Sequence, residues 1–189
     1  IWEVKNFNLT IEKGKLTGFV GETGSGKSTL LDIIMGLLIL DSGKLSVDSK
    51  YITKENIHAW QANIAHVPQN IYLSDSTIIE NIAFGITKEE INIELVKKAA
   101  KDACISDYIE GLPNKYYSTV GESGISLSGG QIQRIGIARA LYKEADVLVL
   151  DEATSALDKK TQERVMSSIV NSNNELTLLI IAHRLSTLD

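Results

Sequence analysis

The sequence has 189 residues, which suits one domain with an inserted lobe, and 43% of them are hydrophobic at a mean hydropathy of +0.01, which is typical of a globular chain. Its longest apolar run, residues 33–40, is too short for a membrane-spanning helix, which needs about 20 residues. The formal net charge is −5 and no run is dense in Lys and Arg, so we expect no nucleic acid among its partners.

The first residue and the cysteine content indicate the context of the chain. It begins at Ile1 with neither an initiator Met nor a signal-peptide pattern, so we expect it to be part of a longer protein. Its only cysteine, Cys104, cannot form an internal disulfide, which fits a reducing cytosol. Cys104 follows a helical run without a local acid or base, and we interpret it as a packing residue.

The first third of the chain predicts strands around one helix. Residues 4–11 alternate apolar and polar side chains, and residues 16–20 lead into a glycine-rich turn, so both segments are typical of strands. Residues 27–38 predict a buried helix because apolar residues recur at helical spacing. Residues 44–47 and 64–67 are two further strand candidates.

The middle of the chain, residues 70–141, reads as mainly helical. Ser76 or Thr77 can cap a first short helix. Residues 91–103 are amphipathic, and residues 128–141 predict another helix. This stretch therefore predicts a helical lobe inserted into the rest of the chain.

The last third predicts a strand at residues 147–150, a helix at 159–170 and a second strand at 176–181. Both strands are apolar throughout, as expected for strands that are buried on two faces. Together with the strand, loop and helix at the start of the chain, this order indicates an α/β core with a mainly parallel sheet.

Residues 21–28 fit the phosphate-loop pattern G-x-x-x-x-G-K-[ST], between a predicted strand and a predicted helix. Glycines let the backbone N–H groups face phosphates, Lys27 would bridge the β- and γ-phosphates, and the Ser28 hydroxyl would bind Mg²⁺. The alternative is a chance glycine-rich turn, which arises in roughly one chain of this length in a hundred. The predicted nucleotide-binding residues of this loop are Gly21, Glu22, Thr23, Gly24, Ser25, Gly26, Lys27, Ser28 and Thr29.

Two carboxylates end the buried strand at residues 147–150. Ligands of parallel α/β sheets collect at the carboxyl ends of strands, so Asp151 would bind Mg²⁺ and Glu152 would orient or deprotonate the attacking water. The alternative is a pair of solvated carboxylates at a strand end. The phosphate loop elsewhere in the chain favours the catalytic interpretation.

A second anion-binding pattern opens the helix predicted from residue 128. Here a hydroxyl and backbone N–H groups are exposed at a helix start, on Ser128, Gly129, Gly130 and Gln131. A single subunit does not need two cradles for one phosphate group. The alternative is an N-cap serine followed by two linker glycines.

In order along the chain, the phosphate loop, residues 127–131 and the Asp151–Glu152 pair resemble the motifs of the ABC ATPase family, with ATP and Mg²⁺ as cofactors. The resemblance implies that Gln69 contacts Mg²⁺ or water, and that residues 155–158 reach the other subunit, with Asp158 among the nucleotide-binding residues. It also implies that His183 lies near the γ-phosphate. Without the family, Gln69 would be a loop residue and His183 a hydrogen-bonded residue at a strand end.

The resemblance also implies an architecture and partners. Residues 1–69 and 142–189 would form a RecA-like P-loop NTPase core, truncated at both ends, and residues 70–141 the helical subdomain. Residues 69–82 and 119–124 look like those of exporters, more loosely of exporters that flip lipid-linked oligosaccharides. The implied partners are a second nucleotide-binding domain, head to tail, and membrane domains fused N-terminally, at the cytoplasmic face of the cell membrane.

Two departures from the family pattern concern the ends of the chain. The aromatic residue that stacks on adenine lies upstream of the first strand in the family, and we interpret Trp2 as a core or edge residue instead. The chain also stops six residues after His183. Two other classes are less compatible with the sequence. A chromosome-structure ATPase needs a long coiled coil, and a ribosome-binding member needs a second domain and a basic surface.

Overall fold

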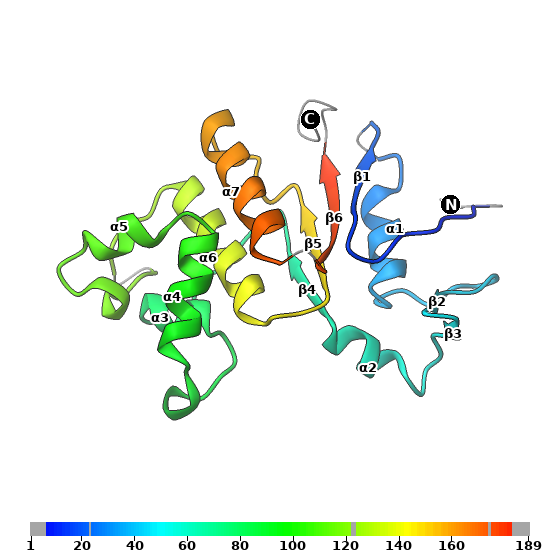
Figure 1. Cartoon of the computed structure of the whole chain (residues 1–189), viewed down its shortest axis with the longest axis horizontal. Helices are drawn as coiled ribbons and strands as arrows, with labels where there is room; N and C mark the ends of the chain where they lie inside the picture. The colour runs from blue at the N-terminus through cyan, green and yellow to red at the C-terminus, as the bar shows by residue number, and fades with distance from the viewer. Residues whose placement is uncertain (1–6, 23, 122–123, 174, 183–189) are drawn as a thin grey trace.

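The computed structural model describes residues 7–22, 24–121, 124–173 and 175–182. Its centre is a four-stranded sheet in the order β1 (Leu16–Val20), β6 (Thr177–Ala182), β5 (Val147–Asp151) and β4 (Ile64–Val67). All three pairings between neighbours are parallel. The mainly parallel α/β core predicted from the sequence is therefore confirmed (Figure 1).

The apolar strands are buried on two faces because alternate side chains point to opposite sides of the sheet. Val147 and Val149 belong to the hydrophobic cluster around α1 (Lys27–Ile34). Leu148 and Leu150 belong to the larger cluster on the opposite face. This division explains why the strand reads as a continuous apolar run rather than as an alternating one.

Helices cover both faces. On one face α1 packs through Leu31, and the Trp60 indole Nε1 of α2 (Ile57–Ala62) donates a 2.8 Å hydrogen bond to the Ile34 carbonyl. Trp60 thus has a structural role. The other face carries α6 (Gly129–Tyr142) and α7 (Lys159–Ser172), and Ile135, Ile137, Val165 and Ile169 contribute fully buried side chains there.

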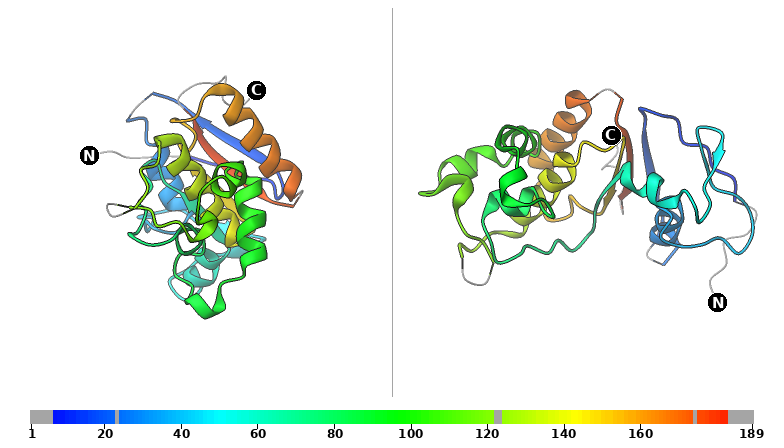
Figure 2. Two further views of the ribbon diagram at one scale, coloured as in Figure 1. Left: turned by 90° about the vertical axis from the view of Figure 1, so that its left-hand side faces the viewer. Right: turned by 90° about the horizontal axis from the view of Figure 1, so that it is seen from below.

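The helical lobe contains α3 (Ile78–Ile82), α4 (Ile93–Asp102) and α5 (Ser106–Glu110), with short 3-10 turns at Lys88–Glu90 and Lys115–Tyr117. Its buried residues share one hydrophobic cluster with the sheet, because α6 packs against α3, α4 and β4. In Figures 1 and 2 this lobe lies at one end of the molecule, and α1, β2 (Ser46–Val47) and β3 (Lys50–Tyr51) lie at the other.

Helix α1 ends earlier than the predicted residue 38. Its C-cap is Met35, and the next residue, Gly36, has a φ of 70°. The Gly36 and Leu37 N–H groups donate to the carbonyls of Ile33 and Asp32, which is the Schellman arrangement that ends a helix. Leu37 and Leu38 are consequently 58% and 45% exposed, so the predicted burial of both was wrong.

The strand predictions were partly wrong as well. Residues 7–11 form no strand, and residues 4–6 lie outside the described part of the chain. The candidate strand at residues 44–47 is shorter than predicted. Only β2, at Ser46–Val47, forms there, and it pairs with β3 over two residues in an antiparallel hairpin. Helix α2 was not predicted, because six residues are too short to show a helical period. Helix α5 lies within residues 70–141, which the sequence predicted as mainly helical.

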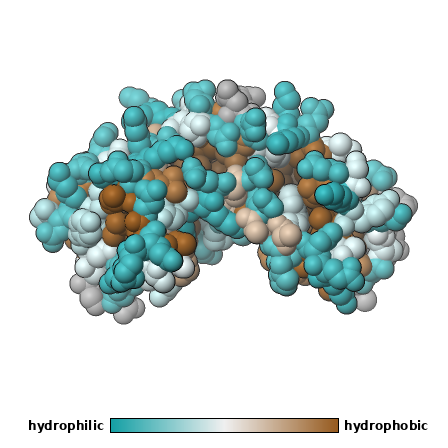
Figure 3. Space-filling model, turned by 60° about the horizontal axis from the view of Figure 1, so that its bottom comes forward, coloured by the Kyte–Doolittle hydropathy of each residue, from teal (hydrophilic) through white to brown (hydrophobic). Residues whose placement is uncertain are grey.

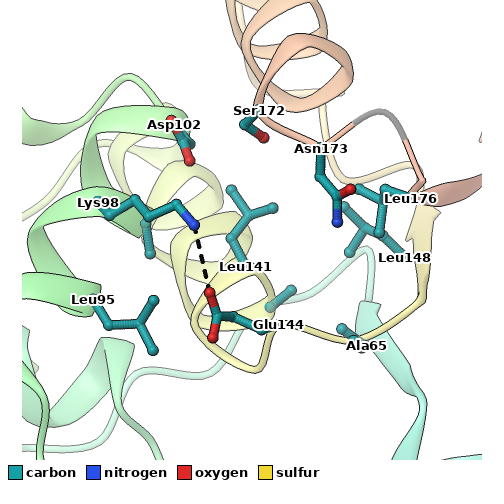
Figure 4. Close-up of a pocket in the computed structure, with 13 residues that line it drawn as sticks. Ala65, Leu95, Lys98, Asp102, Leu141, Glu144, Leu148, Ser172, Asn173 and Leu176 are labelled. Carbon is teal, nitrogen blue, oxygen red and sulfur yellow. Dashed lines mark hydrogen bonds and ion pairs between the residues drawn. The ribbon is translucent and has the colours of Figure 1, made fainter.

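The molecule is hollowed along one edge between its two ends (Figure 3). A small cavity of about 70 Å³ lies where α4, the turn after α6 and the end of α7 meet. At its mouth the Lys98 and Glu144 side chains point toward each other and form a 3.4 Å ion pair (Figure 4). Within the described ranges, no helix has the length and apolar character needed to cross a membrane.

Candidate functional site

The predicted motifs converge on one edge of the sheet. The phosphate loop follows β1, Gln69 follows β4, and Glu152 follows β5. Because these strands are parallel, their carboxyl ends lie on the same edge, which is where ligands of such sheets bind.

The phosphate loop is closed tightly at its start. A side chain on Gly21 would place its Cβ 2.8 Å from the Ser25 Oγ, so any larger residue would force the Ser25 side chain to move. Gly26, the N-cap of α1, has a φ of 90°, a conformation that glycine adopts without strain. The backbone of the loop therefore leads directly into the first turn of α1. Thr23, one of the predicted binding residues, lies outside the described residues.

Lys27 lies across the loop that precedes it. Its Nζ donates to the carbonyls of Gly21 and Glu22, both at 2.8 Å, and to the Ser25 Oγ at 3.3 Å. Three neutral oxygens thus hold the ammonium group of Lys27 at the start of α1. The helix dipole is positive at this end, so the lysine and the dipole both favour an anion there. Ser28 and Thr29 follow on the exposed first turn of α1.

Asp151 is the last residue of β5 and is partly buried. Burial raises the pKa of its carboxyl above the ordinary value, and the nearby carboxylates of Glu152 and Asp32 add to the increase. The positive charges of His66 and Lys27 oppose it. A cation beside Asp151 would favour the ionised form in the same way.

Glu152 has a backbone conformation that is unusual for a residue with a side chain. Its φ is 52°, in the left-handed region, and its N–H donates to the Ile181 carbonyl of β6. The chain turns away from β5 at this residue. Its Oε2 accepts a 2.7 Å hydrogen bond from the Gln69 Nε2. The structure therefore brings together two predicted catalytic residues that are 83 positions apart.

Ser128 is the N-cap of α6 and forms a capping box with Gln131. The Ser128 Oγ accepts from the Gln131 N–H at 3.3 Å, and the Gln131 Oε1 accepts from the Ser128 N–H at 2.7 Å. Gly129 and Gly130 follow in the first turn, where the N–H groups have no carbonyl four residues earlier in the helix to donate to. Among the described residues, no hydrogen bond or ion pair joins this helix start to the phosphate loop of the same chain.

Gln133 joins α6 to residues 155–158. Its side chain is 5% exposed; Nε2 donates to the Ser155 Oγ at 3.1 Å, and Oε1 accepts from the Ala156 N–H at 2.9 Å. The sequence analysis missed this residue. The available signal was its place on the buried stripe of the helix, with Ile137 and Ala140 at helical spacing.

Asp158 caps α7. Its two carboxylate oxygens accept from the Thr161 N–H at 3.0 Å and the Thr161 hydroxyl at 2.6 Å. These hydrogen bonds lower the pKa of Asp158 from its ordinary value. In the described part of the chain, no hydrogen bond or ion pair links Asp158 with the phosphate loop. His183, the remaining predicted catalytic residue, lies outside the described residues.

A groove of about 570 Å³ runs between the loop after β4 and the loop before α6. Asp75 approaches Gly121 across it: a Cβ on Gly121 would meet the Asp75 Oδ1 at 2.6 Å. The lining is mostly apolar: Ile71, Tyr72, Leu73, Asp75, Gly121, Ile125, Ser126, Leu127 and Ile132. The loop at residues 119–124, predicted to resemble that of exporters, forms part of this wall, and residues 122–123 lie outside the description.

Comparisons with known proteins show the family of the chain. A family model described as "ABC transporter" matches residues 4–155. The chain is 41% identical over 184 residues to the ATP-dependent lipid A-core flippase of Psychrobacter cryohalolentis, an alignment that covers 97% of the chain and 31% of that relative. It is 40% identical to ATP-binding cassette sub-family B member 5 of Mus musculus, covering 98% of the chain and 15% of that relative.

A solved structure described as a bacterial Atm1-family ABC exporter with ATP bound is similar to the chain with a TM-score of 0.86 and 37% identity. The alignment covers 94% of this chain and 31% of the exporter. The chain thus spans about a third of the length of its bacterial relatives. On these matches the chain belongs to the ABC transporter family.

Proposed function

We propose that the chain binds ATP with Mg²⁺ and hydrolyses it to power the translocation of a lipid-linked or hydrophobic substrate across a membrane. The observation that carries the proposal is the 2.7 Å hydrogen bond between Gln69 and Glu152, at the sheet edge where the phosphate loop begins. The division into a core of residues 1–69 and 142–189 and a helical subdomain of residues 70–141 stays a prediction.

The phosphate loop supplies the binding energy for the nucleotide. Its N–H groups and the start of α1 face the phosphates, and Lys27 exchanges its contacts with the Gly21 and Glu22 carbonyls for phosphate oxygens. These carbonyls hold the lysine in place before ATP arrives. Little side-chain entropy then remains to be lost on binding.

The residues proposed to bind Mg²⁺ are Ser28, Gln69 and Asp151. A hydroxyl, an amide oxygen and a carboxylate are the hard oxygen ligands that Mg²⁺ prefers. The raised pKa of Asp151 also fits a site that a cation completes. When bound, the metal neutralises charge on the phosphate oxygens.

Glu152 is proposed to accept a proton from the attacking water. The Gln69 Nε2 donates a hydrogen bond to this carboxylate. The Gln69 amide oxygen would then bind the metal or accept a hydrogen bond from the water. The left-handed backbone of Glu152 ends the strand direction of β5 at this residue, beside Gln69. The role of His183 beside the γ-phosphate stays a prediction from the family resemblance.

Two copies of the domain are proposed to clamp ATP head to tail. The phosphate loop of one copy would face residues Ser128 to Gln131 of the other, and Asp158 would complete the same nucleotide site. What supports this arrangement is the anion-binding start of α6, which no described hydrogen bond or ion pair connects with the phosphate loop of its own chain. Gln133 ties this helix to residues 155–158, so both parts of the contact surface would approach ATP together.

The membrane partner is proposed to dock in the 570 Å³ groove. A mostly apolar lining with Asp75 at its rim suits the end of a helix from a membrane domain. The names of the relatives, a lipid A-core flippase among them, and the third of their length that the chain spans support fused membrane domains. Their N-terminal position stays a prediction from the family resemblance. The domain would then act at the cytoplasmic face of the cell membrane.

Phosphate release by the complete protein tests the proposal. Wild-type protein is expected to hydrolyse ATP only with Mg²⁺, and Asp151→Asn is expected to need more Mg²⁺ for half-maximal rate. Asp32→Asn is the matched control, because Asp32 lies near Asp151 but is not among the proposed ligands. Hydrolysis that is independent of Mg²⁺, or an Asp151→Asn variant with wild-type Mg²⁺ dependence, would contradict the assignment.

A further inference from the structure

Asn81 in α3 is a completely buried polar side chain whose amide is used in full. Its Oδ1 accepts from the Ser74 N–H at 2.9 Å and the Ser74 hydroxyl at 3.2 Å. Its Nδ2 donates to the Ser74 carbonyl, the Ser76 hydroxyl and the Thr77 carbonyl at 3.0 to 3.1 Å. The Asn81 side chain, which is 0% exposed, therefore contacts residues 74, 76 and 77 of the segment that leads into α3.

Arg139 of α6 approaches the same segment from the other side. Its Nε donates to the Asn81 carbonyl at 2.8 Å, its Nη2 to the Asn81 Oδ1 at 3.2 Å, and its Nη1 to the Tyr72 carbonyl at 3.0 Å. The guanidinium carbon lies 4.8 Å from the centre of the Phe84 ring. Only the planar fork of an arginine reaches these acceptors together, so a lysine could replace its charge but not its geometry.

Residues 72–77 are also held by backbone hydrogen bonds, among them one from the Val120 N–H to the Ser76 carbonyl at 2.9 Å, and by the capping box of Thr77 with Glu80. They form neither helix nor strand, apart from a single bridge between Thr77 and Thr119. Tyr72, Leu73 and Asp75 from this segment line the groove. Asn81 and Arg139 therefore contribute side-chain hydrogen bonds that hold this wall of the groove in shape.

Helix α6 connects this wall with the proposed nucleotide contact. It begins after Ser128 and passes Ile132 in the lining of the groove, and it carries Arg139 nearly three turns after its start. A shift of the helix start would move Arg139 with it, because a helix of 14 residues behaves as one rigid element. Arg139 would in turn move the Tyr72 carbonyl to which it is bonded.

We propose that Asn81 and Arg139 are positioning residues that couple α6 to the wall of the groove at residues 72–77. ATP held at the start of α6 would then reshape the surface offered to the membrane partner. This coupling rests on the proposed function, since it needs ATP at Ser128 of α6. It adds a path through α6 that touches neither Gln69 nor the metal.

Hydrogen exchange read by mass spectrometry on the complete protein tests the coupling. All variants carry Glu152→Gln, so that ATP stays bound, and the peptide over residues 72–77 is followed with and without Mg-ATP. In the parent protein ATP is expected to change the exchange of this peptide. In Arg139→Lys the peptide is expected to exchange about tenfold faster, because hydrogen bonds from a charged group are lost. Its exchange should also no longer change when ATP is added.

Arg134→Lys is the matched control on the same helix. Its Nη1 and Nε donate to the Cys104 and Gly130 carbonyls, away from residues 72–77, so the peptide is expected to keep its response. Asn81→Asp is the second variant, for use if Arg139→Lys does not fold. It keeps the Oδ1 acceptor and removes the hydrogen bonds that the Asn81 Nδ2 donates. It is expected to lose the response as well.

Nucleotide affinity and dimer formation are measured on the same samples. If the parent protein does not bind ATP, the proposed function fails. If ATP binds but the peptide does not respond in the parent, or responds equally in Arg139→Lys or Asn81→Asp, the coupling is wrong and the proposed function stands. Loss of the response in Arg134→Lys would also overturn the specific roles of Asn81 and Arg139.

Discussion

The Gln69 Nε2 lies 2.7 Å from the Glu152 Oε2, and this hydrogen bond joins the loop after β4 to the loop after β5. An amide donates through its nitrogen and accepts through its oxygen, so Gln69 can orient Glu152 and bind a cation with the same group. The contact makes the proposed base part of a network before any ligand arrives.

Lys27→Ala is expected to weaken ATP binding by at least about 100-fold, since charge-assisted hydrogen bonds to two phosphates are worth roughly 3 kcal/mol together. Lys27 is the lysine of the phosphate loop, and its Nζ already lies over the Gly21 and Glu22 carbonyls. Titration calorimetry with ATP measures the effect. Lys50→Ala, in the exposed hairpin, should leave affinity unchanged, and an unchanged affinity in Lys27→Ala would refute the phosphate-loop assignment.

Ser128→Arg is expected to leave ATP binding by the single domain intact and to stop hydrolysis. The new side chain would fill the space where the phosphates of the partner's nucleotide are proposed to lie. Ser128→Ala is the control, because it removes the N-cap without adding a large side chain. Loss of the N-cap alone costs about 1 kcal/mol of stability. Binding and turnover are measured on one sample of the complete protein. If binding is lost together with turnover in Ser128→Arg, the serine acts within its own subunit and the head-to-tail arrangement is wrong.

Gln133→Leu is expected to lower the free energy of unfolding by about 1–3 kcal/mol, because the Ser155 hydroxyl and the Ala156 N–H lose a buried partner. It should also reduce turnover while ATP affinity is kept, since residues 155–158 would no longer follow α6. Denaturant unfolding and phosphate release measure the two effects. Gln162→Leu on α7 is the control. Equal turnover in Gln133→Leu and wild type would show that the link between α6 and residues 155–158 is only structural.

Glu80→Gln is expected to destabilise the protein by about 1 kcal/mol at pH 7, the usual value of a helix cap. Hydrogen bonds from Lys88 and Thr77 lower the pKa of Glu80 from 4.5 to about 2. Since its pKa is depressed in the folded state, this stabilisation is complete above about pH 4.5 and is lost as the pH falls through about 2.

Urea unfolding at pH 7, 5 and 3 tests this sign. The difference between wild type and Glu80→Gln should be equal at pH 7 and 5 and smaller at pH 3. Glu89→Gln, in the neighbouring 3-10 turn, is the control with a change below about 0.5 kcal/mol. A difference that grows toward low pH would contradict the capping role of the carboxylate.

The sequence predicted the fold best where several signals coincided. Strand β5 was both apolar and followed by two carboxylates, and α6 had a serine cap before its apolar residues, so both elements lie within a residue or two of the prediction. The prediction was wrong where a local turn decided the outcome. Gly36 ends α1 early, and its Cβ would meet the Ile57 Cγ1 at 2.8 Å, a contact from a helix that the sequence did not reveal.

The site was predicted through motifs, and its long-range contacts were not. Nothing near Gln69 in the sequence indicates a partner 83 residues away, and the family resemblance alone singled it out. Gln133 and Asn81 were missed because a buried amide in a short or amphipathic helix looks like a solvated one until its neighbours are known. Thr77 was one of two possible caps, and the structure shows that it is the one that forms the capping box with Glu80.

The central claim is that Glu152 accepts the proton of the attacking water at a site that two domains close around ATP. Gln has the size of Glu but cannot accept that proton, so Glu152→Gln is expected to lower turnover by roughly 10²- to 10⁴-fold while ATP affinity is kept. A dimer clamped by ATP should then accumulate, because the step that opens it is blocked. Glu175→Gln, on the exposed turn before β6, serves as the control.

Size-exclusion chromatography of Glu152→Gln with Mg-ATP, beside a phosphate-release assay on the same protein, measures both consequences at once. The account predicts a dimer that forms with ATP, dissociates when ATP is removed, and releases almost no phosphate. A variant that hydrolyses ATP at nearly the wild-type rate would contradict the role of Glu152, and a variant that binds ATP, fails to hydrolyse it and stays monomeric would contradict the clamp.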